Sequence, residues 1–298
     1  MRASLSVFLT LCCLTATGAA AQPATPGSRP FTVSRAGAGE PMILIPGLLS
    51  SGDVWQSTVA HYQGRYDVHV LTLAGFGGGT APDGAFLPVV RDAIIAYIRT
   101  QRLARPVIVG HSLGGFLAFW IAATAPGDVG AVIAVDGVPF LGALMNPSAT
   151  ADLSRPQAEQ LRQLYASFTP QQLRTQSQMS LATMITSPAD VERALAWVER
   201  ADARVAGQAV FEMMTTDLRD TVGAIAAPVL LVGAAEFAKD EATRQRVQAA
   251  YEAQVARVKT CRVTLVTTAR HFIMLDAPDA LWSAMDAFLL ARPRPVAQ

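Results

Sequence analysis

The chain has 298 residues, 51% of them hydrophobic and 16% charged, and its 24 Lys and Arg nearly balance its 23 Asp and Glu. A formal net charge of +1 argues against a nucleic-acid-binding protein, which needs a basic excess to meet phosphate groups. The hydrophobic fraction is too high for a disordered chain, and the length suffices for one large domain with a buried core.

The first 21 residues have the pattern of a cleavable secretory signal peptide. Arg2 supplies the positive start, residues 5–14 (LSVFLTLCCL) form an apolar run, and residues 19–21 (AAA) fit a small-residue cleavage site. The apolar run is too short for a membrane span, which needs about 20 residues. We therefore expect a periplasmic or secreted protein without a membrane span, whose mature form keeps only Cys261 of the three cysteines.

From residue 31 onward, runs rich in Val, Ile and Leu alternate with helical patterns. Such runs are typical of strands buried on both faces in a parallel sheet that helices cover. The predicted strands are residues 41–45, 66–73, 106–110, 131–135, 228–233 and 262–266. The predicted helices between them are residues 86–102, 113–125, 239–258 and 278–291. This alternation predicts an α/β fold with a doubly wound, mostly parallel sheet.

The alternation is interrupted once, between Asp136 and Pro228, where no strand pattern occurs. Helical patterns fill this stretch instead, at residues 154–167, 170–184, 188–205 and 207–217. We therefore predict an all-helical cap inserted into the α/β core. The predicted division is a signal peptide (1–21), a linker (22–30), a core (31–139 and 223–291), a helical cap (140–222) and a flexible tail (292–298).

The sharpest motif is GHSLGG at residues 110–115, which follows a predicted strand and opens a predicted helix. A glycine on each side of Ser112 suits a tight strand-to-helix turn, because such a turn leaves no room for larger side chains beside the serine. The turn strains the serine backbone and lifts its hydroxyl above the sheet edge. The following helix directs its N-terminus at the same point, which favours developing negative charge. The motif therefore predicts Ser112 as a catalytic nucleophile.

With this motif the chain resembles the α/β-hydrolase superfamily, in its serine esterase, lactonase and haloperoxidase-like branch, over about residues 31–291. The shared motifs are IPGL at residues 45–48, AGFG at 74–77, GHSLGG at 110–115, PVLLVG at 228–233 and ARHF at 269–272. Epoxide hydrolases and dehalogenases of that fold normally place Asp where this chain has Ser112, so they are disfavoured. The resemblance implies a catalytic triad in the chain order serine, acid, histidine.

The resemblance assigns roles to three further residues. His271 follows the last predicted strand, where the family places the general base that accepts the Ser112 proton. The backbone N–H groups of Leu48 and Leu113 are expected to form the oxyanion hole. No cofactor and no metal are expected, because the histidines and carboxylates do not show metal-ligand spacing.

Two carboxylates compete for the role of triad acid. Glu236 follows the strand after the cap, where most relatives keep the acid, although usually as Asp. Asp136 ends the strand next to the nucleophile strand, where a minority of the family keeps it. Only one of the two is expected to act, with a slight preference for Asp136, while Asp240 is a weaker third candidate.

The predicted cap is rich in Met and in large apolar residues, which suit an adaptable apolar pocket. These residues are Leu144, Met145, Phe168, Met179, Met184, Trp197, Phe211, Met213 and Met214. The sequence thus predicts a serine hydrolase that cleaves a small-molecule, apolar carboxylic ester, or a lactone or thioester, through an acyl-enzyme on Ser112. The alternatives are a lyase, a C–C hydrolase or a cofactor-free haloperoxidase of the same fold, and beyond these a non-catalytic binding protein.

Overall fold

The computed structural model describes residues 30–77, 79, 81 and 84–292. The predicted signal peptide (1–21) and nearly all of the predicted linker (22–30) lie outside the described residues, as does the predicted tail beyond Arg292. Within the described ranges no helix combines the length and the apolar character needed to cross a membrane.

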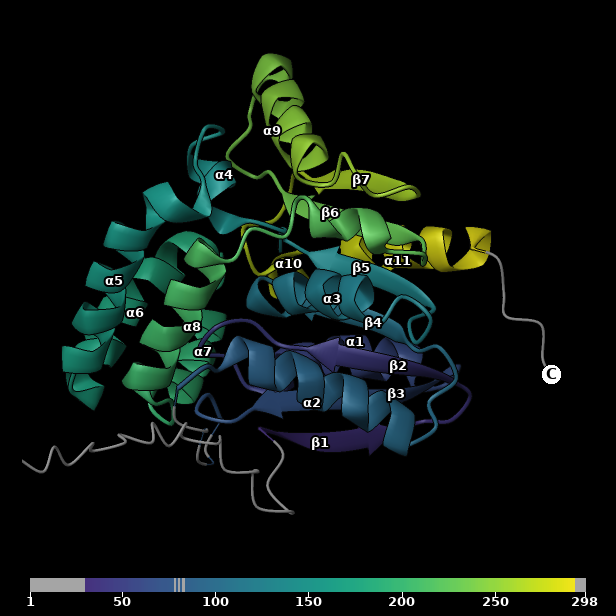
Figure 1. The fold of residues 1–298 in the computed structure, drawn as a ribbon, viewed down its shortest axis with the longest axis horizontal. Helices are drawn as coiled ribbons and strands as arrows, with labels where there is room; N and C mark the ends of the chain where they lie inside the picture. Colours follow the sequence, from purple (N-terminus) through teal and green to yellow (C-terminus); the bar gives the residue numbers. More distant parts are fainter. Residues whose placement is uncertain (1–29, 78, 80, 82–83, 293–298) are drawn as a thin grey trace, which may run out of the picture.

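The core is a seven-stranded sheet in the order β1-β3-β2-β4-β5-β6-β7, shown as a ribbon in Figure 1. The strands are β1 (Phe31–Ala36), β2 (Glu40–Ile45), β3 (Tyr66–Leu73), β4 (Val107–His111), β5 (Ala131–Val135), β6 (Val229–Ala234) and β7 (Cys261–Val266). Every neighbouring pair is parallel except β1 and β3. The predicted fold class is confirmed, whereas the antiparallel edge strand β1 was not among the predicted strands.

Helices cover both faces of this sheet. The longer ones are α1 (Gln56–Tyr62), α2 (Leu87–Thr100), α3 (Leu113–Thr124), α9 (Glu241–Gln254) and α11 (Pro278–Ala291), and the short ones are η1 (Gly52–Trp55), η2 (Thr221–Ala224) and α10 (Ile273–Asp276). α2 and α3 pack together on one face, and α1 and α11 pack on the other (Figure 1). The five central strands are therefore shielded from water on both sides, as their continuous apolar sequences require.

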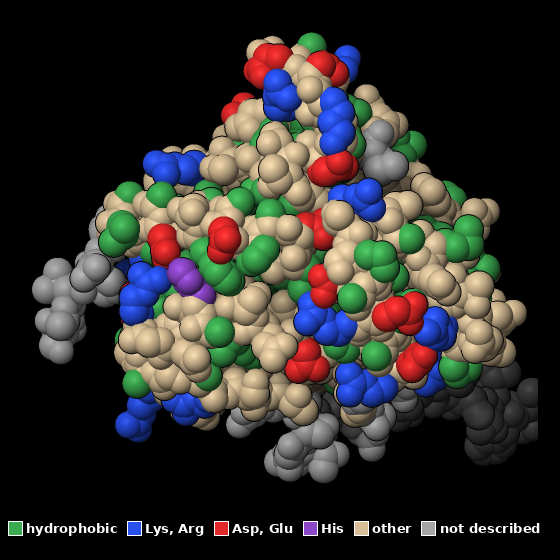
Figure 2. Space-filling model, turned by 180° about the vertical axis from the view of Figure 1, so that it is seen from behind, with side chains coloured by type: hydrophobic (Ala, Val, Ile, Leu, Met, Phe, Trp, Pro, Cys, Tyr) green, Lys and Arg blue, Asp and Glu red, His purple; other side chains and the backbone are tan. Residues whose placement is uncertain are grey.

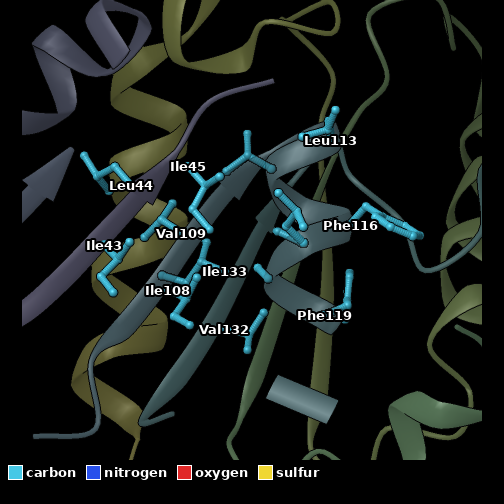
Figure 3. Close-up of a cluster of buried hydrophobic side chains, with 14 of the residues drawn as sticks. Ile43, Leu44, Ile45, Ile108, Val109, Leu113, Phe116, Phe119, Val132 and Ile133 are labelled. Carbon is cyan, nitrogen blue, oxygen red and sulfur yellow. The ribbon is translucent and has the colours of Figure 1, made fainter. Parts of the chain in front are cut away.

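The apolar core surrounds the central strands. Figure 3 shows side chains of β2, β4 and β5 meeting those of α3. Leu113, Phe116 and Phe119 of α3 are almost completely buried, and Phe116 points away from the strand side chains. Burying a large apolar side chain stabilises the fold by about 1.5–3 kcal/mol. The elements that flank the predicted nucleophile are thus set in the apolar core of the molecule.

The cap segment, defined as residues 140–222, joins β5 to β6 and stands beside one end of the sheet (Figure 1). It contains α4 (Leu141–Met145), α5 (Ala151–Ser167), α6 (Pro170–Met184), α7 (Pro188–Val198) and α8 (Ala203–Thr215), followed by η2. α5 packs along α8, and α6 packs along α7.

Local capping moves two helix boundaries of the cap segment away from the predicted ones. The Thr150 hydroxyl accepts a hydrogen bond from the Leu153 N–H, so α5 begins at residue 151, ahead of the predicted start at residue 154. The Asp202 carboxylate accepts one from the Arg204 N–H, so a new helix begins at residue 203, within the stretch predicted as one helix over 188–205.

Arg292 also differs from its prediction as the first residue of a flexible tail. Its side chain is only 3% exposed and forms an ion pair with Glu40 at the start of β2. The charge needs a partner because burial of an unpaired guanidinium is costly, and Glu40 provides it. The described chain is therefore held to the sheet through residue 292.

Acidic and basic side chains are interspersed on the face shown in Figure 2. In the cap segment, Arg162 pairs with Glu159, and Arg174 pairs with both Glu192 and Glu199. Exposed pairs of this kind contribute at most about 1 kcal/mol each to stability. The surface pattern accords with the near-neutral net charge.

Candidate active site

Ser112 occupies the turn between the central strand β4 and α3. Its φ of 53° and ψ of −115° lie outside the regions that L-residues favour. The turn is held by the Ser112 N–H, which donates to the Val135 carbonyl at 2.9 Å, and by the Ser112 carbonyl, which accepts from the Phe116 N–H at 3.0 Å. The sequence thus forms the strained turn that its glycines predict.

The two motif glycines are required by close approach of the backbone. A methyl group on Gly110 would overlap the Gly114 carbonyl, and one on Gly114 would overlap the carbonyl oxygen of Ile45 in β2. A methyl group on Gly137, directly after Asp136, would overlap the Ser112 carbonyl oxygen. The turn can therefore approach β2 and β5 only because these positions lack a side chain.

His271 and Asp136 come together from loops that follow β7 and β5. His271 Nδ1 lies 2.6 Å from Asp136 Oδ2. An ionised carboxylate can only accept, so Nδ1 carries the proton and donates it, which leaves Nε2 with a free lone pair. Ser112 and His271 both line the same pocket. The structure brings these three predicted residues together at the carboxyl ends of β4, β5 and β7.

The Asp136 carboxylate accepts hydrogen bonds from other groups besides His271. Its φ of 48° is left-handed, and its Oδ1 accepts from the Ala234 N–H at 2.8 Å and from the Tyr251 hydroxyl. Burial alone would raise the pKa of Asp136, but the hydrogen bonds and charge of His271, together with those two donors, hold that pKa below its usual value. Asp136 is therefore ionised at neutral pH.

Glu236, the alternative acid, does not reach His271. Its carboxylate forms an ion pair with Lys239 and lies 3.9 Å from the Arg270 guanidinium. The Lys239 ammonium holds the pKa of Glu236 below its usual value. Asp240, the weaker candidate, accepts from the N–H and hydroxyl of Thr243 and caps α9. Of the three carboxylates, the structure places only Asp136 against the histidine.

The loop after β2 lies beside the nucleophile. Leu48 lines the pocket, and a methyl group on Gly47 would come within 3.3 Å of Ser112 Cβ. Leu48 is followed by Leu49, whose φ of 58° turns the chain sharply. Leu113 is the first residue of α3, so its N–H has no carbonyl one helical turn earlier. The backbone groups predicted to bind an oxyanion thus lie in the two segments that flank Ser112.

His111 is buried behind the site. Its Nε2 lies 3.1 Å from the His271 carbonyl oxygen, which can only accept, so Nε2 is the donor. Its Nδ1 has no hydrogen-bond partner in the described part of the chain. Burial, followed by the nearby His271, holds the pKa of His111 well below its usual value. His111 is therefore a neutral support for the His271 backbone.

A pocket of about 170 Å³ lies over Ser112, between the core and the cap segment. Its apolar walls come from Leu48, Leu49 and Phe272 in the core and from Leu181, Met184, Ala194, Trp197 and Val198 in the cap segment. Its polar groups outside the triad are Ser50, His111, Tyr165, Gln176, Ser177 and Ser180. The cap segment therefore provides nine of the sixteen residues that line the pocket.

The apolar residues singled out in the cap segment do not all gather at this pocket. Met184 and Trp197 line it, whereas Met179 is 67% exposed on the opposite side of α6. Met213 and Met214 are buried in α8. Composition alone could not separate these positions, because it does not give the rotation of each helix.

The loop that carries His271 is hydrogen-bonded to the end of α6. The Phe272 N–H donates to the Met184 carbonyl at 3.2 Å, and Arg270 donates to the Ala182 carbonyl at 3.0 Å. Asp276 accepts from the Thr186 N–H and hydroxyl, both at 2.9 Å, and from the Arg270 N–H. Residues 182–186 of the cap segment thus support the loop that presents His271.

Among the described residues, no group of three or more His, Cys, Asp or Glu side chains has an arrangement that could hold a metal ion. Cys261, the cysteine in β7, is not part of the pocket lining, and burial raises the pKa of its thiol to about 12.

The sequence profile of the alpha/beta hydrolase family matches residues 42–284. This match spans most of the chain and includes Ser112, Asp136 and His271. The chain belongs to the alpha/beta hydrolase family. The resemblance stated from the motifs is confirmed.

Related proteins are hydrolases. A pimeloyl-[acyl-carrier protein] methyl ester esterase of Aliivibrio salmonicida is 33% identical over 107 residues, which are 36% of this chain and 40% of that esterase. The match thus spans less than half of that relative. An (E)-2-((N-methylformamido)methylene)succinate hydrolase of Acinetobacter baylyi is 25% identical over 86% of this chain and 93% of its own length.

Solved structures share the fold at low identity. The enol-lactonase from Burkholderia xenovorans LB400 superposes with a TM-score of 0.69 and 16% identity, covering 87% of this chain and 96% of its own. A hydrolase from Pseudomonas aeruginosa PA01 superposes with a TM-score of 0.73 and 18% identity, and the superposition covers 88% of this chain and 94% of that hydrolase. At these identities the likeness is one of fold.

The motifs did not indicate Tyr251 as part of the site. It lies in α9, more than 100 residues from Asp136, and is buried with its hydroxyl on the Asp136 carboxylate. A tyrosine in a predicted helix carries no sequence signal of such a contact. Only the packing of α9 against β6 brings it there.

Proposed function

We propose that this chain is a serine hydrolase that cleaves a carboxylic ester, with lactones and thioesters as chemically related substrates. The observation that carries this proposal is the 2.6 Å hydrogen bond between His271 and Asp136, beside a strained Ser112 on the same pocket. A histidine whose Nδ1 proton is fixed by a buried carboxylate offers Nε2 as a base to a neighbouring hydroxyl.

In this mechanism Ser112 attacks the acyl carbon while His271 accepts its proton. Asp136 fixes the histidine tautomer and stabilises the imidazolium that forms. The N–H groups of Leu48 and Leu113 bind the oxyanion, and the N-terminus of α3 adds a favourable dipole. His271 then returns the proton to the leaving alcohol, and a water molecule activated by His271 cleaves the acyl-enzyme.

The substrate is proposed to be small and largely apolar, because Leu, Met, Val, Trp, Phe and Ala residues make up half of the residues that line the pocket. Apolar walls with a few polar groups are typical of small-molecule sites. Glu236 takes no part in this mechanism, since its carboxylate is engaged by Lys239.

Covalent labelling with a fluorophosphonate probe tests the nucleophile. We expect the wild-type protein to be labelled and Ser112→Ala to remain unlabelled while keeping its fold, as judged by circular dichroism. A series of aryl esters of increasing acyl length then measures the substrate preference. Failure of the wild-type protein to react with the probe would contradict the proposed serine hydrolase.

We also propose that the chain is exported and cleaved after residue 21. The charged start, apolar run and small-residue site of residues 1–21 support this proposal. Mass spectrometry of the protein recovered from a periplasmic fraction is expected to give Gln22 as the first residue. An uncleaved N-terminus in the cytoplasmic fraction would contradict it.

A further inference from the structure

We infer that the active-site pocket selects uncharged esters and rejects substrates that carry a carboxylate near the scissile bond. This inference rests on the proposed ester-hydrolase function and specifies its substrate class. It starts from the described lining of the pocket, which contains no Lys, Arg, Asp or Glu side chain beyond the triad acid behind His271.

The polar groups of the lining are neutral. The Ser50 hydroxyl donates to the Leu48 carbonyl at 3.3 Å, and the Ser180 hydroxyl donates to the Gln176 carbonyl at 3.3 Å. Because each hydroxyl has one proton, both present lone pairs to the pocket rather than donors. The lining also holds the side chains of Tyr165, Gln176 and Ser177, which are neutral hydrogen-bond donors. Neutral donors can bond a carboxylate but supply no opposite charge, so a carboxylate buried in this pocket stays unpaired.

The cation nearest in sequence to the catalytic histidine is committed elsewhere. Arg270 donates to the carbonyls of Ala182 and Ile185 and lies near Glu236. Its guanidinium is not part of the pocket lining. A bound carboxylate would therefore have no described arginine or lysine to pair with, and burying an unpaired charge is strongly unfavourable.

The triad itself adds a repulsive charge. Asp136 is ionised, and His271 must be neutral to act as a base, so the site carries about one negative charge before substrate binds. An anionic group in the pocket would be repelled by this charge at low local dielectric. An uncharged ester buries no unpaired charge and is not repelled by Asp136, and its apolar groups are stabilised by contact with the apolar pocket wall.

A matched substrate pair tests the inference. Mono-p-nitrophenyl adipate carries a free carboxylate, and its methyl ester has the same chain without the charge. We expect kcat/KM of the wild-type protein to be about 100-fold higher, or more, for the methyl ester. Equal rates, or faster cleavage of the free acid, would overturn the inference.

Ser180→Arg introduces a cation on the pocket wall. It should lower the ratio of kcat/KM for the methyl ester to kcat/KM for the free acid by about tenfold. The control is Gln178→Arg, which adds the same charge on α6 at an exposed position outside the lining and should leave the ratio unchanged. If both variants lowered this ratio equally, the inference that the pocket wall sets the substrate preference would be overturned. If Ser180→Arg fails to fold, the kcat/KM ratio of the two adipate esters with the wild-type protein still tests the inference.

Fluorophosphonate labelling separates this inference from the proposed function. If the protein is labelled at Ser112 but cleaves the free acid faster, the proposed function stands and the inference about uncharged esters is wrong. A protein that is neither labelled nor active on either adipate ester loses the proposed function itself.

A second inference comes from an independent contact, and the geometry points to Tyr251 as a positioning residue for the triad acid. Its hydroxyl donates to Oδ1 of Asp136, the oxygen that does not contact His271. Together with the Ala234 N–H, it fixes the carboxylate plane so that Oδ2 faces the histidine. A methyl group on Gly233 would come within 2.6 Å of the Tyr251 ring, so this glycine makes room for it.

Tyr251→Phe tests this role, with Tyr97→Phe as the matched control. Tyr97 is also buried, and its hydroxyl lies 2.7 Å from His69 Nδ1, away from the pocket. We expect Tyr251→Phe to lower kcat about tenfold with little change in KM, since it removes a hydrogen bond to a charged group. Tyr97→Phe should lose stability without losing kcat.

The pH profile distinguishes positioning from a general loss of structure. Without the hydroxyl, Asp136 becomes more basic and holds the imidazolium more strongly, so the acid limb of kcat/KM should move to higher pH. A Tyr251→Phe variant with an unchanged profile and an unchanged kcat would overturn the inference. Equal losses of kcat in both tyrosine variants would do the same.

Discussion

In the α/β core, Ser112, Asp136 and His271 follow three parallel strands, and around Ser112 and Asp136 backbone atoms meet at positions that only glycine can occupy. In the cap segment, the same pocket is closed by flexible side chains such as Met184 on helices linked by exposed ion pairs. The core therefore fixes the chemistry within narrow limits, because a small shift would break the turn. Apart from residues 182–186, which are hydrogen-bonded to the His271 loop, we expect the cap segment to tolerate changes of its side chains without disturbing that geometry and to influence which substrate fits.

The largest difference is expected between the two carboxylates at the ends of β5 and β6. Asp136→Asn should lower kcat about 10⁴-fold, because an amide cannot hold the histidine in the reactive tautomer. Glu236→Gln should stay within about twofold of the wild type, since it removes only a surface ion pair. Steady-state hydrolysis of an aryl ester measures both. Comparable losses in the two variants would break the proposed assignment of the acid.

The rigidity of the core is tested by adding one methyl group. Gly114→Ala should lower the free energy of unfolding by about 3 kcal/mol or more, because the methyl overlaps the Ile45 carbonyl and the backbone must move. Gly127→Ala is the control, since a methyl there meets nothing within 4 Å. Chemical denaturation measures both variants. Similar stabilities for the two would show that the turn is less constrained than its contacts indicate.

The connection between the two regions depends on a buried carboxylate. Glu212 of α8 accepts from the N–H groups of Phe86 and Leu87 at 2.9 and 2.6 Å, and so caps α2, whose own N-cap residue makes no side-chain hydrogen bond. Glu212→Gln should cost about 2 kcal/mol of unfolding free energy. Glu199→Gln, at an exposed ion pair of the cap segment, should cost less than about 0.5 kcal/mol. Denaturant titration of the two variants ranks them, and a reversed order would contradict this account.

The smallest effect is expected at the pocket wall. Met184→Ala enlarges the pocket and should raise kcat/KM for longer acyl chains relative to short ones by about threefold, leaving stability nearly unchanged. Met179→Ala, on the exposed side of the same helix, should leave the ratio as it is. The aryl ester series measures this change. A shift in the Met179 variant alone would show that substrates enter along another face.

The sheet and the tight turn at Ser112 could be predicted because they are under local constraint. A run of Val and Ile predicts a strand buried on both faces, and the glycines around Ser112 predict a tight turn because they stand between a predicted strand and a predicted helix. The edge strand β1 was missed because one of its faces is solvent-exposed and its sequence FTVSRA has no such run.

The acid could not be decided from sequence, because both Asp136 and Glu236 follow core strands and either could turn toward the histidine. The outcome depends on the left-handed backbone of Asp136 and on the Tyr251 hydroxyl, which belongs to a distant helix. The composition of the pocket was also out of reach, because the rotation of α6 and α7 decides which of their residues face Ser112.

The hydrogen bonds between residues 182–186 and the loop of His271 have a consequence for engineering. A chimaera that exchanges the whole cap segment for that of another hydrolase would remove Thr186 and the Met184 carbonyl, the partners of Asp276 and Phe272. The transplanted enzyme would then carry a loosened general base along with its new specificity. A graft that retains residues 182–187 of the present chain, and replaces the helices on either side, would transfer substrate preference while leaving the catalytic loop anchored.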